Sequence, residues 1–201
     1  MRCKVFNPCR RWQTSSIMRI ICIHARLKRV VPWCPVVNWE RPPAQFFKIN
    51  VDGALKTDDS VRGLGVVIRN DRGELIVAAA KLVGGMFMPN VTELFAIRFG
   101  LQLAMDLGLQ HIQLESGAQA AIQMAFQRDA DLGYEGVLVN EIQVLANSFH
   151  SCLGQFRPRT CNRVAHSLAH FALSISDLIV WMEDGPEWLS SLLANDVMVV
   201  S

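Results

Sequence analysis

Two acidic residues of this sequence stand where a carboxylate could bind a divalent cation. Asp52 ends an alternating segment in which Ile49 and Val51 share one face, so its side chain belongs to the opposite face at the end of a strand. Glu93 opens a segment with helical periodicity and would point toward a sheet packed against that helix. Two carboxylates brought together in this way could share one cation. Each also has a purely structural explanation, because Asp favours turns and Glu favours the first turn of a helix.

The elements that must position these carboxylates follow from the turns and the apolar periodicity of the chain. Strands are expected at residues 46–55, 64–69, 74–83, 111–116 and 153–157, and helices at residues 91–107, 118–127, 137–149 and 162–174. The first three strands are joined by glycine-containing turns, which predicts an antiparallel meander. The chain is therefore predicted to form an α/β domain with a mixed five-stranded sheet flanked by helices.

The expected long helix has one apolar face and one polar face. The apolar face consists of Ala96, Ile97, Gly100, Leu101 and Ala104. Because Glu93 lies on the same face, this helix should pack across the sheet with Glu93 turned toward it. Gly100 should then be buried in the contact between the helix and the sheet.

Charge divides the chain into a basic leader and an acidic body. Residues 1–39 carry eight Lys or Arg and no Asp or Glu, whereas residues 40–201 carry twelve basic and all eighteen acidic residues. We assign residues 39–201 to the domain and residues 1–38 to a poorly ordered leader. The acidic body is unfavourable for tight binding to a phosphate backbone, which depends on clustered Lys and Arg.

The cysteines and the apolar segments bear on the compartment of the protein. The six cysteines include no C-x-x-C pair, which argues against zinc and for free thiols inside the cell, in the nucleus or cytoplasm. The apolar run at residues 17–25 is interrupted by Arg19 and His24 and is too short to span a bilayer, so we expect no membrane association. The Arg-rich leader leaves organelle targeting as an alternative. We predict a monomer.

Five motifs follow one another along residues 48–169. They are K-I-N-V-D-G-A at 48–54, G-L-G-V-V-I-R-N at 63–70, T-E-L-F-A-I-R at 92–98, I-Q-L-E-S at 112–116 and P-R-T-C-N-R-V-A-H-S-L-A at 158–169. Together they resemble the plant ribonuclease H-like domain, which is related to type 1 ribonuclease H and to retroelement reverse transcriptases. The resemblance covers about residues 39–196 and implies the ribonuclease H-like fold.

The resemblance implies hydrolysis of the RNA strand of an RNA–DNA hybrid by two Mg²⁺ ions held by four carboxylates. Asp52 matches the first carboxylate and Glu93 the second, so these two are the expected metal ligands. Gly117 stands where the third acid belongs, and His166 stands where the fourth belongs. Glu115 lies two residues before Gly117 on the same strand face and is the remaining candidate to replace a lost carboxylate.

Loss of two carboxylates predicts impaired catalysis, because neutral imidazole is a poor ligand for Mg²⁺. The domain would then bind an RNA–DNA hybrid or structured RNA through Arg157, Arg159, Asn162 and Arg163, near the start of the last expected helix. The same residues are also typical of a solvated helix end. The alternative is a catalytically inactive protein-interaction module or a retroelement-derived fragment.

His166 and His170 are four residues apart on the last expected helix, as zinc-binding pairs can be. No acidic ligand follows at the spacing of metalloproteases, and H-E-x-x-H is absent. At this level the pair is better explained as surface or half-buried histidines.

Overall fold

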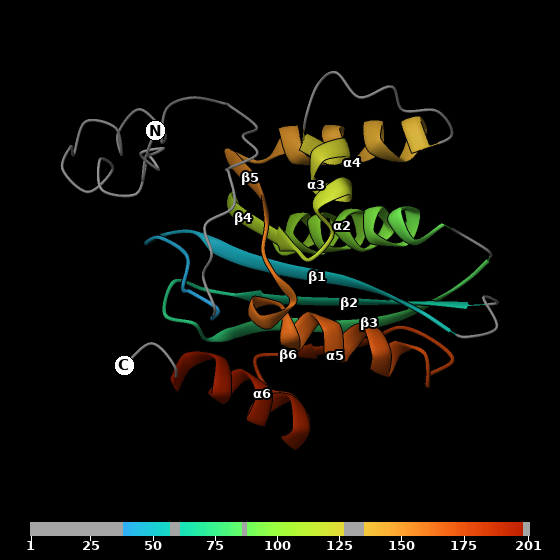
Figure 1. The fold of residues 1–201 in the computed structure, drawn as a ribbon. Coiled ribbons are helices and arrows are strands. Elements are labelled where there is room, and N and C mark those ends of the chain that lie inside the picture. Colours follow the sequence, from blue (N-terminus) through green and yellow to red (C-terminus); the bar gives the residue numbers. More distant parts are fainter. Residues whose placement is uncertain (1–37, 57–60, 86–87, 127–134, 199–201) are drawn as a thin grey trace, which may run out of the picture.

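The part of the chain that the computed structural model describes, residues 38–56, 61–85, 88–126 and 135–198, contains one six-stranded sheet between two layers of helices (Figure 1). The leader assigned to residues 1–38 lies outside the described residues except for Asn38. None of the helices in the described ranges has the length and apolar character needed to cross a membrane.

The sheet begins with the predicted antiparallel meander. It consists of β1 (Phe47–Leu55), β2 (Val61–Arg69) and β3 (Leu75–Gly84). The next strands, β4 (His111–Ser116) and β5 (Ser151–Phe156), run parallel to β1, and β6 (Ile179–Met182) pairs antiparallel with β3. The strand order is β5-β4-β1-β2-β3-β6, so the ends of β1 and β4 lie next to each other near the centre of the sheet.

The predicted class, a mixed α/β domain, is confirmed, but the sheet has six strands in the described residues and not the predicted five. The missed strand is β6, a four-residue segment without polar alternation. Such a short apolar run has no distinctive period, and only its pairing with β3 makes it a strand.

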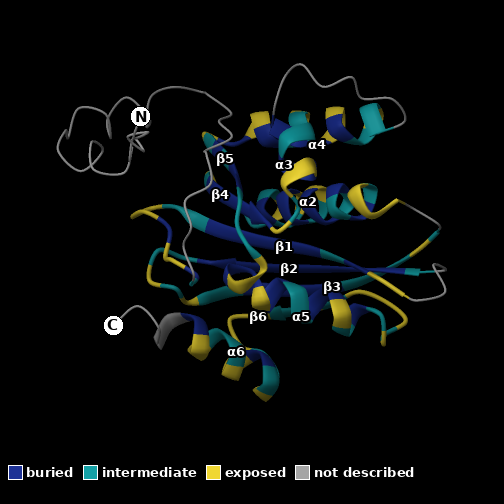
Figure 2. Cartoon of the chain, in the orientation of Figure 1, coloured by how far each residue is buried: buried dark blue, intermediate teal, exposed yellow. Residues whose placement is uncertain are grey.

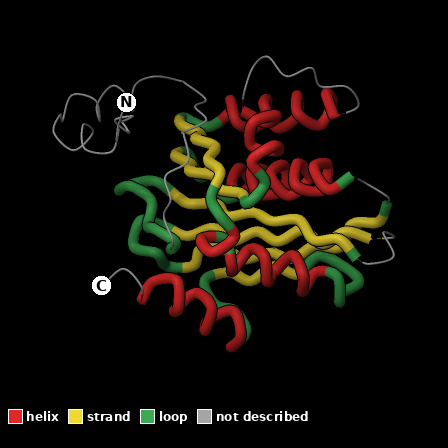
Figure 3. Tube along the Cα trace, viewed as in Figure 1, coloured by secondary structure: helices red, strands yellow, loops and turns green. Residues whose placement is uncertain are grey.

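Among the described residues, three helices cover one face of the sheet and two cover the other (Figures 1 and 3). The first face carries α2 (Pro89–Asp106), α3 (Gln119–Phe126) and α4 (Gly136–Ser148). The second carries α5 (Arg163–Ala172) and α6 (Glu187–Met198), and a short 3₁₀ helix, η3 (Arg159–Cys161), precedes α5.

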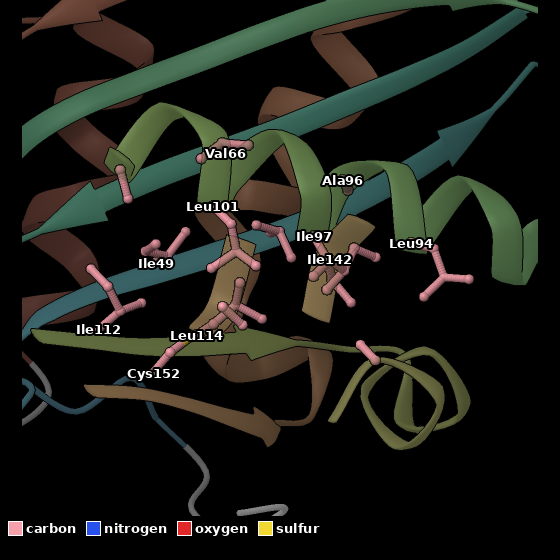
Figure 4. Packing of buried hydrophobic residues seen from close by; sticks show 14 of the residues in the cluster. Ile49, Val66, Leu94, Ala96, Ile97, Leu101, Ile112, Leu114, Ile142 and Cys152 are labelled. Atoms are coloured by element: carbon pink, nitrogen blue, oxygen red, sulfur yellow. The ribbon is translucent and has the colours of Figure 1, made fainter. Parts of the chain in front are cut away.

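The predicted face of α2 is buried against the sheet, which confirms the periodicity argument (Figures 2 and 4). Ile97 and Leu101 pack with Ile49 in the core on this side of the sheet. A Cβ atom on Gly100 would lie only 2.7 Å from Cγ1 of Val51. The absence of a side chain at Gly100 therefore sets how closely α2 approaches β1.

On the opposite face, α5 approaches the sheet just as closely. A Cβ atom on Gly65 would collide with the backbone of α5 at the carbonyl oxygen of Ala165. Because Gly65 pairs with Asp52 across β1 and β2, this approach fixes α5 beside Asp52. His166 follows Ala165 and is thereby directed to the same place.

Candidate active site

Asp52 and Glu93 lie close together where the first turn of α2 meets β1. Asp52 is buried near the end of β1, opposite Gly65. The Glu93 carboxylate accepts hydrogen bonds from the backbone N–H of Gly53 and from the hydroxyl of Ser116, whose Oγ lies 3.3 Å from Oε2. Glu93 is therefore held by the residue after Asp52 on β1 and by the last residue of β4. Sequence reasoning did not identify Ser116 as a partner.

The surroundings of these two carboxyls favour their protonated forms. Burial, followed by the charge of Asp52, raises the pKa of Glu93 to about 8, although the hydrogen bonds from Ser116 and Gly53 act against this rise. Burial also raises the pKa of Asp52, and the hydrogen bond from His166 opposes that shift. A carboxyl with a pKa near 8 is largely protonated at neutral pH. The pair is thus a poorly hydrated site that does not tolerate two negative charges easily.

His166 reaches Asp52 from α5. Its Nδ1 atom lies 2.9 Å from Oδ2 of Asp52, so an imidazole protonated on Nδ1 donates a hydrogen bond to the carboxylate. The ring of His166 also contacts that of His170, with ring centroids 4.4 Å apart. Partial loss of hydration on the face toward the protein, followed by the charge of His166, lowers the pKa of the largely exposed His170. The position expected for a fourth carboxylate therefore supplies a nitrogen that already has a partner.

Gly117 lies beside Asp52, between β4 and α3. A Cβ atom placed on Gly117 would be 3.9 Å from Oδ1 of Asp52 and 3.9 Å from the carbonyl oxygen of Arg157, both ordinary contact distances. The backbone thus retains a position from which an acidic side chain could reach Asp52. The residue that occupies it has no side chain to offer.

Glu115 is not available as a metal ligand, because buried basic and polar side chains bind both of its carboxylate oxygens. Its Oε1 atom lies 2.7 Å from Nζ of Lys48 and 3.3 Å from Nε of Arg157, and Oε2 accepts a hydrogen bond of 3.0 Å from Nδ2 of Asn50. Burial lowers the pKa of Lys48, which the charge of Glu115 opposes. Both oxygens of Glu115 therefore already have donors, and these donors come from β1 and from the segment after β5.

The residues expected to contact phosphates differ in how accessible they are. Arg157 has only 15% of its side chain exposed and is paired with Glu115, whereas Arg163 is about half exposed and donates to Asp196 at 3.1 Å. Arg159 is exposed, and its positive charge lowers the pKa of both Asp52 and Glu93. Arg159 is thus the arginine of the cluster that is both accessible and close to the carboxylates.

Asn162 occupies the N-cap position of α5, but its side chain makes no capping hydrogen bond. Its Nδ2 atom instead donates to the carbonyl oxygen of Val51 at 2.8 Å, and the residue is buried. Asn162 therefore joins α5 to β1 directly before Asp52. This hydrogen bond fixes the start of α5 relative to β1. Because it occupies the Asn162 amide nitrogen, that nitrogen is not available to bind phosphate.

Sequence reasoning missed a buried polar network beside the site. Asn50 Oδ1 accepts hydrogen bonds of 3.0 Å from Nε1 of Trp39 and from Nη2 of Arg69. The guanidinium of Arg69 stacks 3.6 Å from the centroid of the Trp39 ring and pairs with Asp196 at 3.1 Å. The available signal was the alternation of β1, which places Asn50 on the same face as Asp52. Trp39 reaches this polar face directly, and Asp196 of α6 reaches it through Arg69.

The donor set does not fit the two-Mg²⁺ centre that the resemblance implies. No group of three or more His, Cys, Asp or Glu side chains within residues 38–56, 61–85, 88–126 and 135–198 is arranged to hold a metal ion. Two Mg²⁺ ions need oxygen ligands from several carboxylates, and only Asp52 and Glu93 are present. Of these two, Asp52 is already hydrogen-bonded to His166.

Comparison of the sequence with known families and proteins places it among relatives of ribonuclease H. A family model described as reverse transcriptase-like matches residues 50–172. A protein of Arabidopsis thaliana, provisionally named a ribonuclease H protein, is 23% identical over 173 residues, covering 81% of this chain and 26% of that protein. The chain therefore spans about a quarter of the length of this curated relative.

Solved structures of ribonuclease H domains share the fold. Ribonuclease H1 of the archaeon Halobacterium salinarum superposes with a TM-score of 0.59 and 22% identity, over 64% of this chain and 98% of that one. The N-terminal ribonuclease H domain of a Mycobacterium tuberculosis protein gives 0.58 and 22%, over 64% and 94%. A ribonuclease H1 solved in complex with an RNA/DNA hybrid gives 0.57 and 18%, over 64% and 96%.

Proposed function

This chain belongs to the reverse transcriptase-like family and has a ribonuclease H-like fold, and from the geometry of its site we propose that the domain binds RNA–DNA hybrids with little or no hydrolysis. The observation that carries this proposal is the environment of Asp52. Its carboxylate faces the imidazole of His166 and the bare backbone of Gly117, where the two-metal reaction requires acids.

Weak catalysis follows from the number of oxygen ligands. In the two-metal reaction one cation activates the attacking water and the other stabilises the leaving oxygen. Asp52 and Glu93 together cannot complete the coordination of two Mg²⁺ ions, and Glu115 is engaged by Lys48 and Arg157. The chemistry should therefore fail even though the fold is intact.

Hybrid binding is supported by the charges around the start of α5. Arg159 and Arg163 are exposed there, and backbone N–H groups of a helix N-terminus favour phosphate. A protein with this fold has been solved in complex with an RNA/DNA hybrid. Phosphate contacts of this kind position a duplex without reading its sequence.

A binding titration in EDTA, run beside a cleavage assay with Mg²⁺ and with Mn²⁺ on a labelled hybrid, tests the proposal. We expect salt-dependent binding without added metal and little cleavage with either ion. Arg159→Ala should weaken binding, whereas Arg98→Ala, on α2 at the opposite face, should not. Strong Mg²⁺-dependent cleavage that Asp52→Asn abolishes would overturn the inactive assignment.

A protein-interaction module is the second candidate, and the edge strand β6 favours it. Val180 and Met182 on this strand are 40% and 53% exposed, and an edge strand can pair with an extended segment of another chain. Failure of the domain to bind hybrid at low salt would place this candidate first. The activity of any longer protein that contains this domain also remains a proposal.

A further inference from the structure

We propose that His166 and His170, with Asp52 hydrogen-bonded to His166, bind a divalent transition-metal ion such as Zn²⁺ beside the candidate active site. This inference does not depend on hybrid binding. It starts from the disagreement between the donor atoms at the site and the oxygen ligands that Mg²⁺ prefers. Imidazole nitrogens suit Zn²⁺, Ni²⁺ and Cu²⁺.

The two imidazoles lie one helical turn apart on α5. Residues separated by four positions share one face of a helix, and a His pair at this spacing is a known chelating arrangement. Here the ring centroids are 4.4 Å apart and the ring planes are inclined by 73°. The rings meet edge to face, so a common ion requires the exposed side chain of His170 to turn one of its nitrogens toward Nε2 of His166.

The contact between His166 and Asp52 distinguishes this pair from ordinary surface histidines. A histidine that binds a metal commonly donates its other ring N–H to a carboxylate, which fixes the tautomer and raises the basicity of the ligating nitrogen. Nδ1 of His166 lies 2.9 Å from Oδ2 of Asp52, so a neutral ring with its proton on Nδ1 carries its lone pair on Nε2.

The site is open enough for an ion with bound water. His170 is exposed, and 28% of the His166 side chain is exposed. Gly117 adds no side chain beside Asp52.

The positive charge of Arg159 offers a way to test the metal site. This charge acts on Asp52, Glu93 and His170, so it disfavours binding of a cation there. Arg159→Gln should therefore strengthen metal binding while it weakens binding to nucleic acid. Because the substitution should raise the affinity for the metal ion and lower the affinity for nucleic acid, the two proposals can be tested independently.

The chain contains a matched control pair at the other end of the parallel strands. His111 and His150 have ring centroids 5.7 Å apart, and Nδ1 of His150 contacts the amide oxygen of Gln110 at 2.9 Å and not a carboxylate. His150 is exposed, as His170 is. It therefore reports nonspecific effects of a metal ion in the same sample.

The experiment is carbethoxylation of histidines in the full chain by diethyl pyrocarbonate, mapped by peptide mass spectrometry during titration with Zn²⁺ or Mg²⁺. Zn²⁺ should slow modification of His170 and leave His150 unchanged, and Mg²⁺ should protect neither. Asp52→Asn should raise the Zn²⁺ concentration for half-protection by about tenfold or more. His166→Gln should remove the protection of His170.

Equal protection of His170 and His150 in the wild-type chain would overturn the proposal without any variant. Protection of His170 that survives His166→Gln would also overturn it, because a single imidazole would then account for binding. The modification rate of His150 in each variant, compared with wild type, shows whether the fold around β4 and β5 is preserved.

Discussion

The Nδ1 atom of His166 on α5 lies 2.9 Å from Oδ2 of Asp52 on β1, so the buried carboxylate is hydrogen-bonded to a side chain of the same protein. An acid at position 166 would place another negative charge beside Asp52 and Glu93, and a cation would be needed to relieve the repulsion. Histidine removes that need. The site can therefore persist in a stable fold without the metal ions that a catalytic version would require.

Restoring both missing acids should restore part of the chemistry. We expect Gly117→Asp combined with His166→Asp to give Mg²⁺-dependent cleavage of an RNA–DNA hybrid above the wild-type level, and either single change to give much less. Space for the first side chain exists, because a Cβ atom on Gly117 makes only ordinary contacts. A labelled-hybrid assay measures this, with Asp52→Asn added to the double variant as the control that should remove the gained activity.

The same double variant should become dependent on metal for stability. Four carboxylates would then face one another without a cation, which lowers the free energy of unfolding in EDTA. Mg²⁺ binds only the folded site and should raise the melting temperature of the double variant more than that of wild type. Thermal unfolding with and without Mg²⁺ measures the difference. Equal Mg²⁺ shifts for both proteins would mean that the backbone no longer holds the site geometry.

Glu93 should make stability depend on pH. Its pKa is about 8 in the folded state, against 4.5 for an ordinary glutamate, so between these values the folded protein keeps a proton that the unfolded chain has lost. The resulting stabilisation is fully present below about pH 4.5 and disappears as the pH rises through 8, a change on the order of 5 kcal/mol. Urea unfolding in EDTA should show this decline in wild type and a flatter profile in Glu93→Gln. Parallel profiles would contradict the assignment.

Gly100 should not accept a larger side chain. Gly100→Val would force α2 away from β1, since even a Cβ atom would lie 2.7 Å from Val51, and we expect a loss of roughly 1–3 kcal/mol in the free energy of unfolding. Gly84→Val is the matched control, because a Cβ atom on Gly84 meets nothing within 4 Å. Chemical denaturation of both variants provides the comparison, and equal losses would count against close packing at Gly100.

Loss of the buried ion pair between Arg69 and Asp196 should lower the free energy of unfolding far more than loss of an exposed ion pair. Asp196→Ala leaves the Arg69 guanidinium buried without its carboxylate, which should cost roughly 3–5 kcal/mol. Glu74→Gln breaks the exposed, solvent-screened pair with Arg72 and should lower the free energy of unfolding far less. Denaturant midpoints report both values. Similar small losses would show that α6 is not firmly held.

The sequence was most informative where periodicity and turns act locally. The meander, the buried face of α2 and the burial of Gly100 were all predicted, because each follows from spacing within a single segment. The strand β6 was missed because four residues carry no period of their own. The partners of Glu115 and Asn50 also escaped prediction, since Lys48, Arg157, Trp39 and Arg69 reach them only after the sheet and helices have assembled.

The contact between Arg69 and Asp196 joins residues that are 127 positions apart, and this separation bears on how the chain folds as it is synthesised. The meander that contains Arg69 leaves the ribosome well before α6 does, and during that interval the guanidinium has no carboxylate to meet. The Arg69 end of β2 can therefore reach its final pairing only when the last helix arrives, as expected for contacts of long sequence separation. A chain that stops short of Asp196 would therefore leave the Arg69 guanidinium of β2 without this carboxylate, in addition to lacking the end of its final helix.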